Sequence, residues 1–219
     1  MIVPAVSKIP APMKKERLRE TYDRFAPKYD WGEALPEVLG LRRLRRRLLA
    51  CARGEVLEVA TGTGKNLRYY PPACRIIAMD LSPRMLALAR RRAARFGVQA
   101  TFLVQDAEAL SFPDNSFDTV VDALSLCTFP DPIGALHEMA RVCRPGGSIL
   151  LLEHGRSEKE RIGRWQDRRA AKHARRAGCR WNLEPHELVC QAGLRLADHQ
   201  RFFFGVFHLM QVAPPQLAA

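Results

Sequence analysis

A glycine turn between two apolar segments constrains the fold of this 219-residue chain more than any other feature. Residues 56–60 form an apolar run that ends in the turn Thr61-Gly62-Thr63-Gly64, and a second apolar run ends at Asp80. In a parallel α/β sheet, a glycine turn after one strand and a carboxylate after the next build a pocket for a nucleoside-bearing cofactor. The turn therefore predicts such a pocket. The alternative is a tight turn of the kind found in any α/β protein, with no ligand bound to it.

Two common nucleotide-binding loops do not match this turn. A P-loop requires a glycine where Val59 stands and a serine or threonine where Asn66 stands. A dinucleotide-binding loop requires a third glycine at the position of Leu67. What remains is a short Gly-Thr-Gly turn that allows close approach to a ligand, with a helix predicted from about Lys65 behind it. Asp80 is then placed to accept hydrogen bonds from the hydroxyls of a ribose.

Apolar runs alternate with helical patterns along most of the chain, which predicts an α/β fold. The expected architecture is a Rossmann-like, seven-stranded, mostly parallel sheet with helices on both faces and an antiparallel C-terminal strand. Strands are predicted at residues 56–60, 76–80, 100–104, 117–124, 148–154, 194–204 and 205–212. Helices are predicted at residues 38–48, from 65, and at 82–96, 132–142, 157–177 and 183–192.

The whole chain, residues 1–219, is predicted to form one domain. Within it we expect a flexible arm at 1–20, because three prolines fall in the first 12 residues, and a helical cap at 21–53. A core at 54–155, a basic helical insert at 156–182, and a C-terminal helix with edge strands at 183–219 complete it. The arginine-rich helix at 38–48 either packs its leucines on the sheet or lies on an anionic membrane.

Further motifs follow the strand ends in order and extend the pattern of the glycine turn. Together they resemble the class I S-adenosylmethionine-dependent methyltransferases, of the type similar to ubiquinone/menaquinone-biosynthesis C-methyltransferases, over about residues 20–155. Residues 150–193 are most similar to the small thiol methyltransferases called methyltransferase-like protein seven, and bacterial phospholipid N-methyltransferases resemble the front half. The motifs are Asp80-Leu-Ser-Pro-Arg-Met-Leu86, Asp106-Ala107, Phe112-Pro-Asp-Asn-Ser-Phe-Asp118 and Arg141-Val-Cys-Arg-Pro-Gly-Gly147.

The resemblance implies S-adenosylmethionine as cofactor, S-adenosylhomocysteine as product, and a set of contacts between them and this chain. Many relatives have glycine at the position of Ala60, but alanine is also small. The implied contacts are Glu58, Ala60, Gly62 and Gly64 around the methionine end, Asp80 at the ribose, Leu81 and Met85 near the adenine, Asp106 and Ala107 on the adenine, Leu124 and Ser125 along the methionine tail, and Tyr29 closing over the cofactor.

Methyl transfer from a sulfonium requires alignment of the acceptor and exclusion of water, and a base only where the acceptor must lose a proton. His154, at the end of the fifth predicted strand, is the candidate base or else a structural histidine. Asp122 either faces the cleft or bonds a neighbouring loop. Cys127 and Cys179 are expected to pack rather than to act as nucleophiles, because direct transfer needs no covalent enzyme intermediate.

The positive charge is concentrated in two segments that flank the predicted core. The formal net charge is +12, of which residues 1–53 carry +7 and residues 157–180 carry +6. These segments either form charged faces exposed to solvent or bind an anionic partner. In the family resembled here, the same two segments cover the acceptor pocket.

The expected acceptor is a small thiol, with a phospholipid or quinone at a membrane surface as the alternative. RNA is a second alternative, disfavoured because Asp122-Ala-Leu-Ser125 stands where an Asn/Asp-Pro-Pro-Tyr/Phe motif would be. An inactive cofactor-binding protein is the non-enzyme alternative, disfavoured because Gly62, Gly64, Asp80 and Asp106 are intact. Oligomeric state is not predicted.

Six cysteines without a Cys-x-x-Cys pair favour reduced cytoplasmic thiols over a disulfide framework or a zinc site. No metal is therefore expected, although a cysteine-dependent metalloid site stays open. The chain has no apolar run near the roughly 18 residues that span a bilayer, and its start lacks the apolar region of a signal peptide. We expect a cytoplasmic protein, with peripheral membrane attachment as the open alternative.

Overall fold

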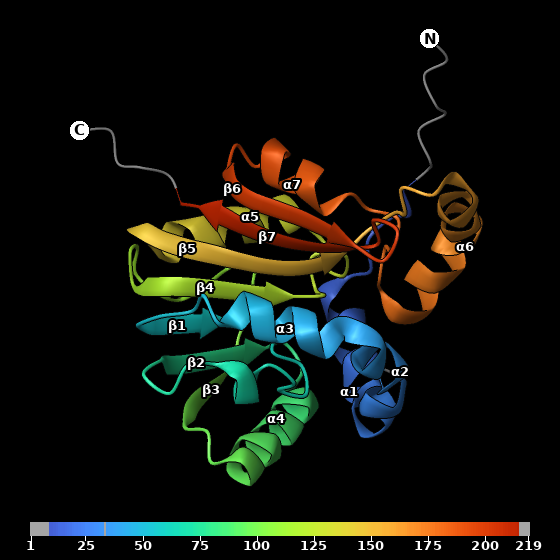
Figure 1. The fold of residues 1–219 in the computed structure, drawn as a ribbon. Helices are drawn as coiled ribbons and strands as arrows, with labels where there is room; N and C mark the ends of the chain where they lie inside the picture. The colour runs from blue at the N-terminus through green and yellow to red at the C-terminus, as the bar shows by residue number, and fades with distance from the viewer. Residues whose placement is uncertain (1–8, 33, 215–219) are drawn as a thin grey trace.

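The computed structural model describes residues 9–32 and 34–214, which fold around one seven-stranded sheet (Figure 1). The strand order is β3-β2-β1-β4-β5-β7-β6. The first five strands of this order run parallel, whereas β7 is antiparallel to β5 and to β6. The predicted fold class and the antiparallel edge hairpin are confirmed. The strands are β1 (Glu55–Glu58), β2 (Arg75–Asp80), β3 (Ala100–Val104), β4 (Phe117–Ala123), β5 (Cys143–His154), β6 (Arg195–Phe202) and β7 (Phe207–Ala213).

Helices cover both faces of the sheet (Figure 1). On one face lie α3 (Arg42–Leu49) and α4 (Pro83–Phe96), and on the other lie α5 (Pro132–Val142) and α7 (Pro185–Gln191). Successive side chains of β5 alternate between the two apolar cores: Leu150 and Leu152 pack in the core with α3 and α4, while Ile149 and Leu151 pack in the core with α5 and α7. This alternation is what a strand buried on both faces requires.

Local signals explain why α4 begins and ends where predicted. The Ser82 hydroxyl accepts a hydrogen bond from the Met85 amide at 3.1 Å, Pro83 occupies the first helical position, and Gly97 ends the helix with φ of +65°. A hydroxyl cap, a proline at the first position and a left-handed residue at the end are the usual boundaries of a helix. The start of α4 places the Asp80–Ser82 segment at the carboxyl end of β2.

The N-terminal segment differs from the predicted arm. Helix α1 (Lys15–Gly32) begins at Lys15, so the prediction that residues 1–20 are flexible is wrong for Lys15–Glu20; residues 1–8 lie outside the described part of the chain. Met13 and Leu18 are buried, and Leu18 lies close to Gly178 at the end of α6 (Glu160–Ala177). The start of α1 is therefore held by an apolar contact with a helix distant in sequence.

The predicted helix at 38–48 is divided by a kink. The short α2 (Ala34–Pro36) leads into the π-helical η1 (Glu37–Leu41), in which Gly40 has φ of +148°, and α3 follows. Leu41, Leu44 and Leu48 are buried, so α3 packs its leucines on the sheet, whereas Val38, before the kink, is exposed. Of the two alternatives for this helix, sheet packing is observed for α3.

The helix predicted from Lys65 is also wrong: only the short 3₁₀ helix η2 (Leu67–Tyr69) forms there. Pro71 and Pro72 follow after one residue. Proline lacks the amide hydrogen that a helix needs, and it disfavours helical geometry in the residue before it.

Among residues 9–32 and 34–214, none of the helices combines the length and the apolar composition that a bilayer span requires. The segments α1, α2 and α6 gather beyond the end of the sheet toward which β1 and β4 point (Figure 1).

Candidate active site

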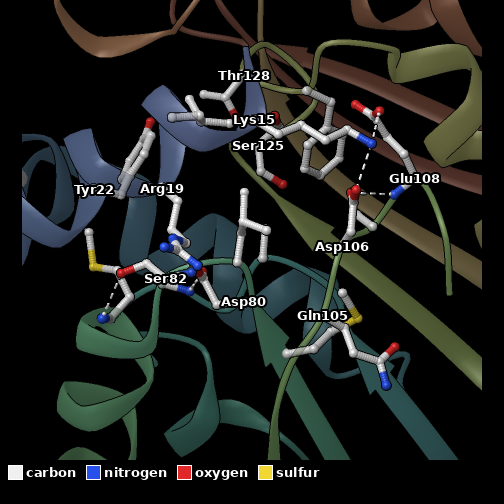
Figure 2. A pocket seen from close by; sticks show the side chains of 18 of the residues that line it. Lys15, Arg19, Tyr22, Asp80, Ser82, Gln105, Asp106, Glu108, Ser125 and Thr128 are labelled. Carbon is white, nitrogen blue, oxygen red and sulfur yellow. Dashed lines mark hydrogen bonds and ion pairs between the residues drawn. The ribbon is translucent and has the colours of Figure 1, made fainter. Parts of the chain in front are cut away.

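A first cavity lies at the carboxyl ends of β1, β2 and β4, where α1 covers it (Figure 2). This is where ligands bind in parallel α/β sheets. The structure brings ten of the sequence-predicted residues to its wall. They are Tyr29, Ala60, Gly62, Asp80, Leu81, Met85, Asp106, Ala107, Leu124 and Ser125.

Asp80 organises the glycine turn. Its Oδ2 accepts a hydrogen bond from the Gly62 amide and its Oδ1 accepts one from the Ser82 amide, both at 2.8 Å. Burial raises the pKa of Asp80 to about 6, and the two amide hydrogen bonds oppose that rise. Each carboxylate oxygen still has a second lone pair. Asp80 can therefore hold the turn and accept hydrogen bonds from ligand hydroxyls at the same time.

Asp106 lies across the cavity from Asp80, and the Lys15 side chain of α1 reaches toward it (Figure 2). Asp106 Oδ1 accepts the Glu108 amide at 2.9 Å, and the Lys15 ammonium lies 2.6 Å from Asp106 Oδ2 and 2.7 Å from Glu108 Oε2. Arg19 and Tyr22 also line the cavity. Lys15 and Arg19 were missed because they fall in the predicted arm, but the helical spacing of Leu18, Tyr22, Phe25 and Tyr29 could have revealed α1.

Two predicted cofactor residues do not line the first cavity. Glu58 is buried and accepts hydrogen bonds from Asn66 Nδ2 and the Tyr70 hydroxyl, both at 2.9 Å. Burial raises its pKa to about 7. A Cβ on Gly64 would lie 2.7 Å from Leu67 Cδ1 and 3.0 Å from Ala89. Glu58 and Gly64 thus act in this structure by fixing the turn against η2 and α4.

The end of β4 combines backbone strain with buried carboxylates. Leu124 has φ of +66°, a conformation that costs free energy and that clusters at functional sites. The Ser125 hydroxyl donates to Asp122, and the Ser125 amide donates to Glu153 at 3.3 Å. Burial raises the pKa of both carboxyls, and the charge of Asp122 raises that of Glu153 further. Asp122 therefore bonds the neighbouring loop, and Ser125 is held at the wall of the first cavity.

A second cavity of about 480 Å³ adjoins the first. The two share Tyr22, Tyr29, Leu124 and Thr128 as lining residues. The second cavity is assembled from α1, η1, the loop after β4, the end of β5, α6, the segment after α6, and the turn into β7. Its wall is largely aromatic and aliphatic, with Phe25, Leu41, Trp181, Val206 and Phe207 among its residues.

His154, the predicted base, lines this second cavity rather than the first. Its Nε2 lies 3.3 Å from Cys127 Sγ and 3.4 Å from Cys179 Sγ. A hydrogen bond with Cys179 and burial raise the pKa of Cys127 well above its usual value, which disfavours a role as a nucleophilic thiolate. The sequence spacing of these three residues gave no sign that they would meet.

Comparisons with known proteins agree with this arrangement. A family model described as a methyltransferase domain matches residues 57–151. The chain is 35% identical over 149 residues to the phosphatidylethanolamine N-methyltransferase of Cereibacter sphaeroides, covering 67% of this chain and 72% of that protein. It is 37% identical over 150 residues to the ubiquinone/menaquinone biosynthesis C-methyltransferase of Geobacter sulfurreducens, covering 64% of this chain and 59% of that protein.

The solved structure of the DhpI complex with S-adenosylhomocysteine shares the fold, with a TM-score of 0.69 at 23% identity over 91% of this chain and 96% of that one. The chain is also 31% identical to the mitochondrial methyltransferase OMS1 of Saccharomyces cerevisiae, of which it spans 43%. It thus spans about half the length of the first curated relatives it matches. With the glycine turn, Asp80 and Asp106 around one cavity, the chain belongs to the class I S-adenosylmethionine-dependent methyltransferases, in the group that includes the ubiquinone/menaquinone-biosynthesis enzymes.

Proposed function

We propose that this protein transfers the methyl group of S-adenosylmethionine, bound in the first cavity, to a small apolar thiol bound in the second. The observation that carries the proposal is the contact between the two cavities at Tyr22, Tyr29, Leu124 and Thr128. An acceptor in the apolar cavity would reach the methionine end of the cofactor there. Catalysis by alignment requires an acceptor site that opens onto the donor, and methyl transfer is helped when the bound ligands exclude water from between them.

The residues of the first cavity fit the cofactor. Asp80 would accept the ribose hydroxyls, Asp106 the adenine amino group, and the Leu124–Ser125 backbone would lie along the methionine tail. When bound, the cofactor supplies a methyl group that is already activated on a sulfonium. The protein then has to orient the acceptor and exclude water, and α1 contributes to both because Tyr22 and Tyr29 belong to each cavity.

In this proposal His154 would accept the proton of a thiol acceptor. Its imidazole lies at the carboxyl end of β5 and faces the second cavity among sulfur and aromatic groups. A thiol loses its proton far more readily than an alcohol, so a neutral imidazole is a sufficient base. The proton would pass to His154 Nε2 as the sulfur attacks the methyl carbon.

The charge of the second cavity favours a neutral acceptor over an amine. No carboxylate belongs to its wall in the part of the chain that the structure describes, and Lys28 adds a positive charge. An ammonium headgroup would therefore be desolvated without a counter-charge, which is costly. A thiol can enter the same space neutral.

Transfer of labelled methyl groups tests the proposal. The protein would be incubated with methyl-labelled cofactor and, separately, thiophenol, phosphatidylethanolamine vesicles, a naphthohydroquinone and RNA. We expect methylated thiophenol with equimolar S-adenosylhomocysteine. Transfer to another acceptor and none to thiophenol would overturn the thiol as the proposed acceptor. If calorimetry showed binding of neither the cofactor nor its product, the proposal of an enzyme would be overturned.

A matched pair of variants connects that activity to the second cavity. Phe25 and Phe96 are both 38% exposed, but only Phe25 lines this cavity, where its ring meets Tyr22 edge-on. Removing a ring that buries an apolar acceptor costs about 1–2 kcal/mol, so Phe25→Ala should raise the KM for thiophenol about tenfold. Phe96→Ala should leave KM within about twofold. Equal effects on KM in the two variants would show that the acceptor does not bind in the second cavity.

A second candidate acceptor is a lipophilic quinol drawn from a membrane, favoured by exposed apolar residues that are close in sequence to residues lining the second cavity. Trp31 is 86% exposed, and Leu35, Val38 and Leu39 are each more than 60% exposed. They neighbour Gly32, Pro36 and Leu41 of the cavity wall, and Phe203 packs on Gly40. The basic face of α3 follows directly, so an anionic bilayer fits this surface.

Flotation with liposomes tests this second candidate and the associated location, a cytoplasmic protein attached peripherally to a membrane. Binding to anionic vesicles at low salt is expected, weakened by salt and by a paired Trp31→Ser, Leu39→Ser change. Absence of binding to anionic vesicles at low salt would overturn both the peripheral membrane attachment and the quinol acceptor. The small thiol would then remain as the proposed acceptor.

A further inference from the structure

We propose that Cys127, His154 and Cys179 form a three-ligand site for a thiophilic divalent cation, with Zn²⁺ as the best-fitting ion, in the wall of the second cavity. Their Sγ, Nε2 and Sγ atoms all lie within 4.8 Å of one another, and all three residues line that cavity. Among the described residues this is the group of potential metal ligands that the fold brings together. The first cavity and its residues do not contribute to it.

The spacing of the ligand atoms matches tetrahedral zinc. Zn–S bonds of about 2.3 Å and Zn–N bonds of about 2.0 Å at tetrahedral angles separate a sulfur from a nitrogen by about 3.5 Å. The observed separations from His154 Nε2 are 3.3 Å to Cys127 and 3.4 Å to Cys179. The two sulfurs lie within 4.8 Å of each other, against about 3.8 Å at tetrahedral zinc, so completing the site requires a shift of at most about 1 Å. Two sulfurs and an imidazole are donors that zinc prefers and that magnesium and calcium do not.

The backbone holds the two cysteine segments together independently of any ion. The Arg180 amide donates to the Cys127 carbonyl at 3.0 Å, and the Arg180 guanidinium donates to the same carbonyl and to that of Phe129. Gly178 ends α6 in the left-handed conformation and turns the chain back toward β4. Such fixed positions lower the cost of assembling ligands from three distant parts of the chain.

Three protein ligands leave one tetrahedral position for a further group, the arrangement of zinc sites that act on substrates rather than only on folding. This step rests on the thiol acceptor proposed above. With zinc on His154 Nε2, that nitrogen no longer serves as the base; the thiol would instead lose its proton to solvent on coordination and bind as a thiolate. Its sulfur lone pair would form the bond to the methyl carbon as the sulfonium carbon–sulfur bond breaks, with that electron pair remaining on S-adenosylhomocysteine. The neutral thioether product is a weaker ligand and would leave.

Zinc titration of the reduced, metal-free full chain against a chromophoric chelator tests the site. One equivalent should bind, and Co²⁺ in its place should give sulfur-to-cobalt charge-transfer bands with the absorption of a tetrahedral centre. Cys127→Ser and Cys179→Ser should each weaken zinc binding more than about 100-fold, beyond what loss of a supporting residue causes. The exposed Cys51→Ser and Cys190→Ser changes serve as matched controls and should retain one equivalent.

Calorimetry with S-adenosylhomocysteine shows that each variant is folded, because neither Cys127 nor Cys179 lines the first cavity. The site is overturned if the reduced chain takes up no zinc, or if folded Cys127→Ser and Cys179→Ser proteins bind it as the controls do. A Cys127–Cys179 disulfide in protein isolated without reductant, together with no zinc uptake after reduction, would assign the pair to redox chemistry instead.

The function of the site is tested separately from the proposed activity. Thiophenol methylation should fall more than about tenfold after zinc removal and return on its addition, because the bound thiol is then no longer held as thiolate. Equal methylation with and without zinc would overturn the acceptor-binding role and leave the thiol activity intact. Stoichiometric zinc binding without methylation of any thiol would keep the metal site and remove the thiol from the proposed function.

Discussion

The first cavity is built mainly from consecutive strand ends, with α1 as its cover, whereas the second takes most of its wall from segments that lie far apart in the chain. The groups that hold the first, from Ala60 to Ser125, occur in the order in which β1 to β4 leave the sheet. The second adds α1 and η1 from one end of the sequence, and α6 and the turn into β7 from the other, to the loop after β4 and the end of β5. Parallel topology brings strand ends together automatically, but only tertiary packing brings the second set together.

This difference separates what a motif encodes from what the fold adds. Within the glycine turn itself, the two glycines have different environments: a Cβ on Gly62 would meet no atom closer than the Ala60 carbonyl oxygen at 4.0 Å, whereas one on Gly64 would collide with Leu67 and Ala89. Both have positive φ, of +58° and +78°. Gly62 therefore belongs to the ligand-facing wall, and Gly64 to the packing that supports it.

The largest expected effect comes from this glycine pair. Gly64→Ala should lower the free energy of unfolding by about 3 kcal/mol, from left-handed strain plus overpacking against α4. Gly62→Ala should lower it by about 1 kcal/mol, from the strain alone, while weakening S-adenosylhomocysteine binding. Urea unfolding and calorimetry measure the two quantities. Equal destabilisation by both changes would contradict the division of the turn into a ligand-facing and a packing glycine.

The next effect is a pH dependence that belongs to the first cavity. Because the pKa of Asp80 is about 6, its carboxylate is mostly protonated at pH 5 and ionised at pH 7.5. The protonated group is a poor acceptor for ribose hydroxyls, so the Kd of S-adenosylhomocysteine should rise about tenfold between pH 7.5 and pH 5. The free energy of unfolding changes in the opposite direction: as pH rises, ligand binding should strengthen while stability falls. A carboxyl whose pKa is higher in the folded state than in the unfolded state contributes less stability as pH increases from 3.8 to about 6.

Asp80→Asn is the control for this prediction. It retains an acceptor oxygen for one of the two amides that Asp80 binds, but it has no proton to exchange in this range. Its binding should be weak at every pH and should not change from pH 5 to pH 7.5. The same slope in this variant would assign the titration to another group, of which Glu58, with a pKa of about 7, is the first to examine.

The sequence predicted most accurately where a local interaction sets the boundary. Ser82, Pro83 and Gly97 mark α4, and the sheet class follows from alternation of apolar runs. It did not predict distant partners: the apolar spacing from Leu18 to Tyr29 favours a helix at Lys15–Glu20, but no local pattern reveals that Leu18 packs near Gly178. The helix predicted from Lys65 is a different failure, because the prolines that end it are visible in the sequence.

The same reasoning explains the candidate site. Asp80 and Asp106 could be predicted because Asp80 ends β2, Asp106 comes two residues after β3, and parallel strands end at one edge of the sheet. The predicted contacts of Glu58 and Gly64 followed from position in the motif, but strand alternation turns Glu58 toward Tyr70 instead. Cys127 and Cys179 are 52 positions apart and meet only because α6 returns the chain to the end of β4.

The smallest expected effect lies where α1 joins the two cavities. Lys15 binds the Asp106 carboxylate, the group that would accept the adenine amino hydrogen, so the ammonium and the ligand compete for it. An ion pair with a partly exposed lysine contributes up to about 1 kcal/mol, so Lys15→Met should tighten S-adenosylhomocysteine binding about threefold. Lys14→Met, one residue away and outside the cavity, is the control and should leave Kd unchanged. Weaker binding in Lys15→Met would mean that Lys15 instead fastens α1 over the bound cofactor. The first cavity would then depend on the same long-range packing as the second.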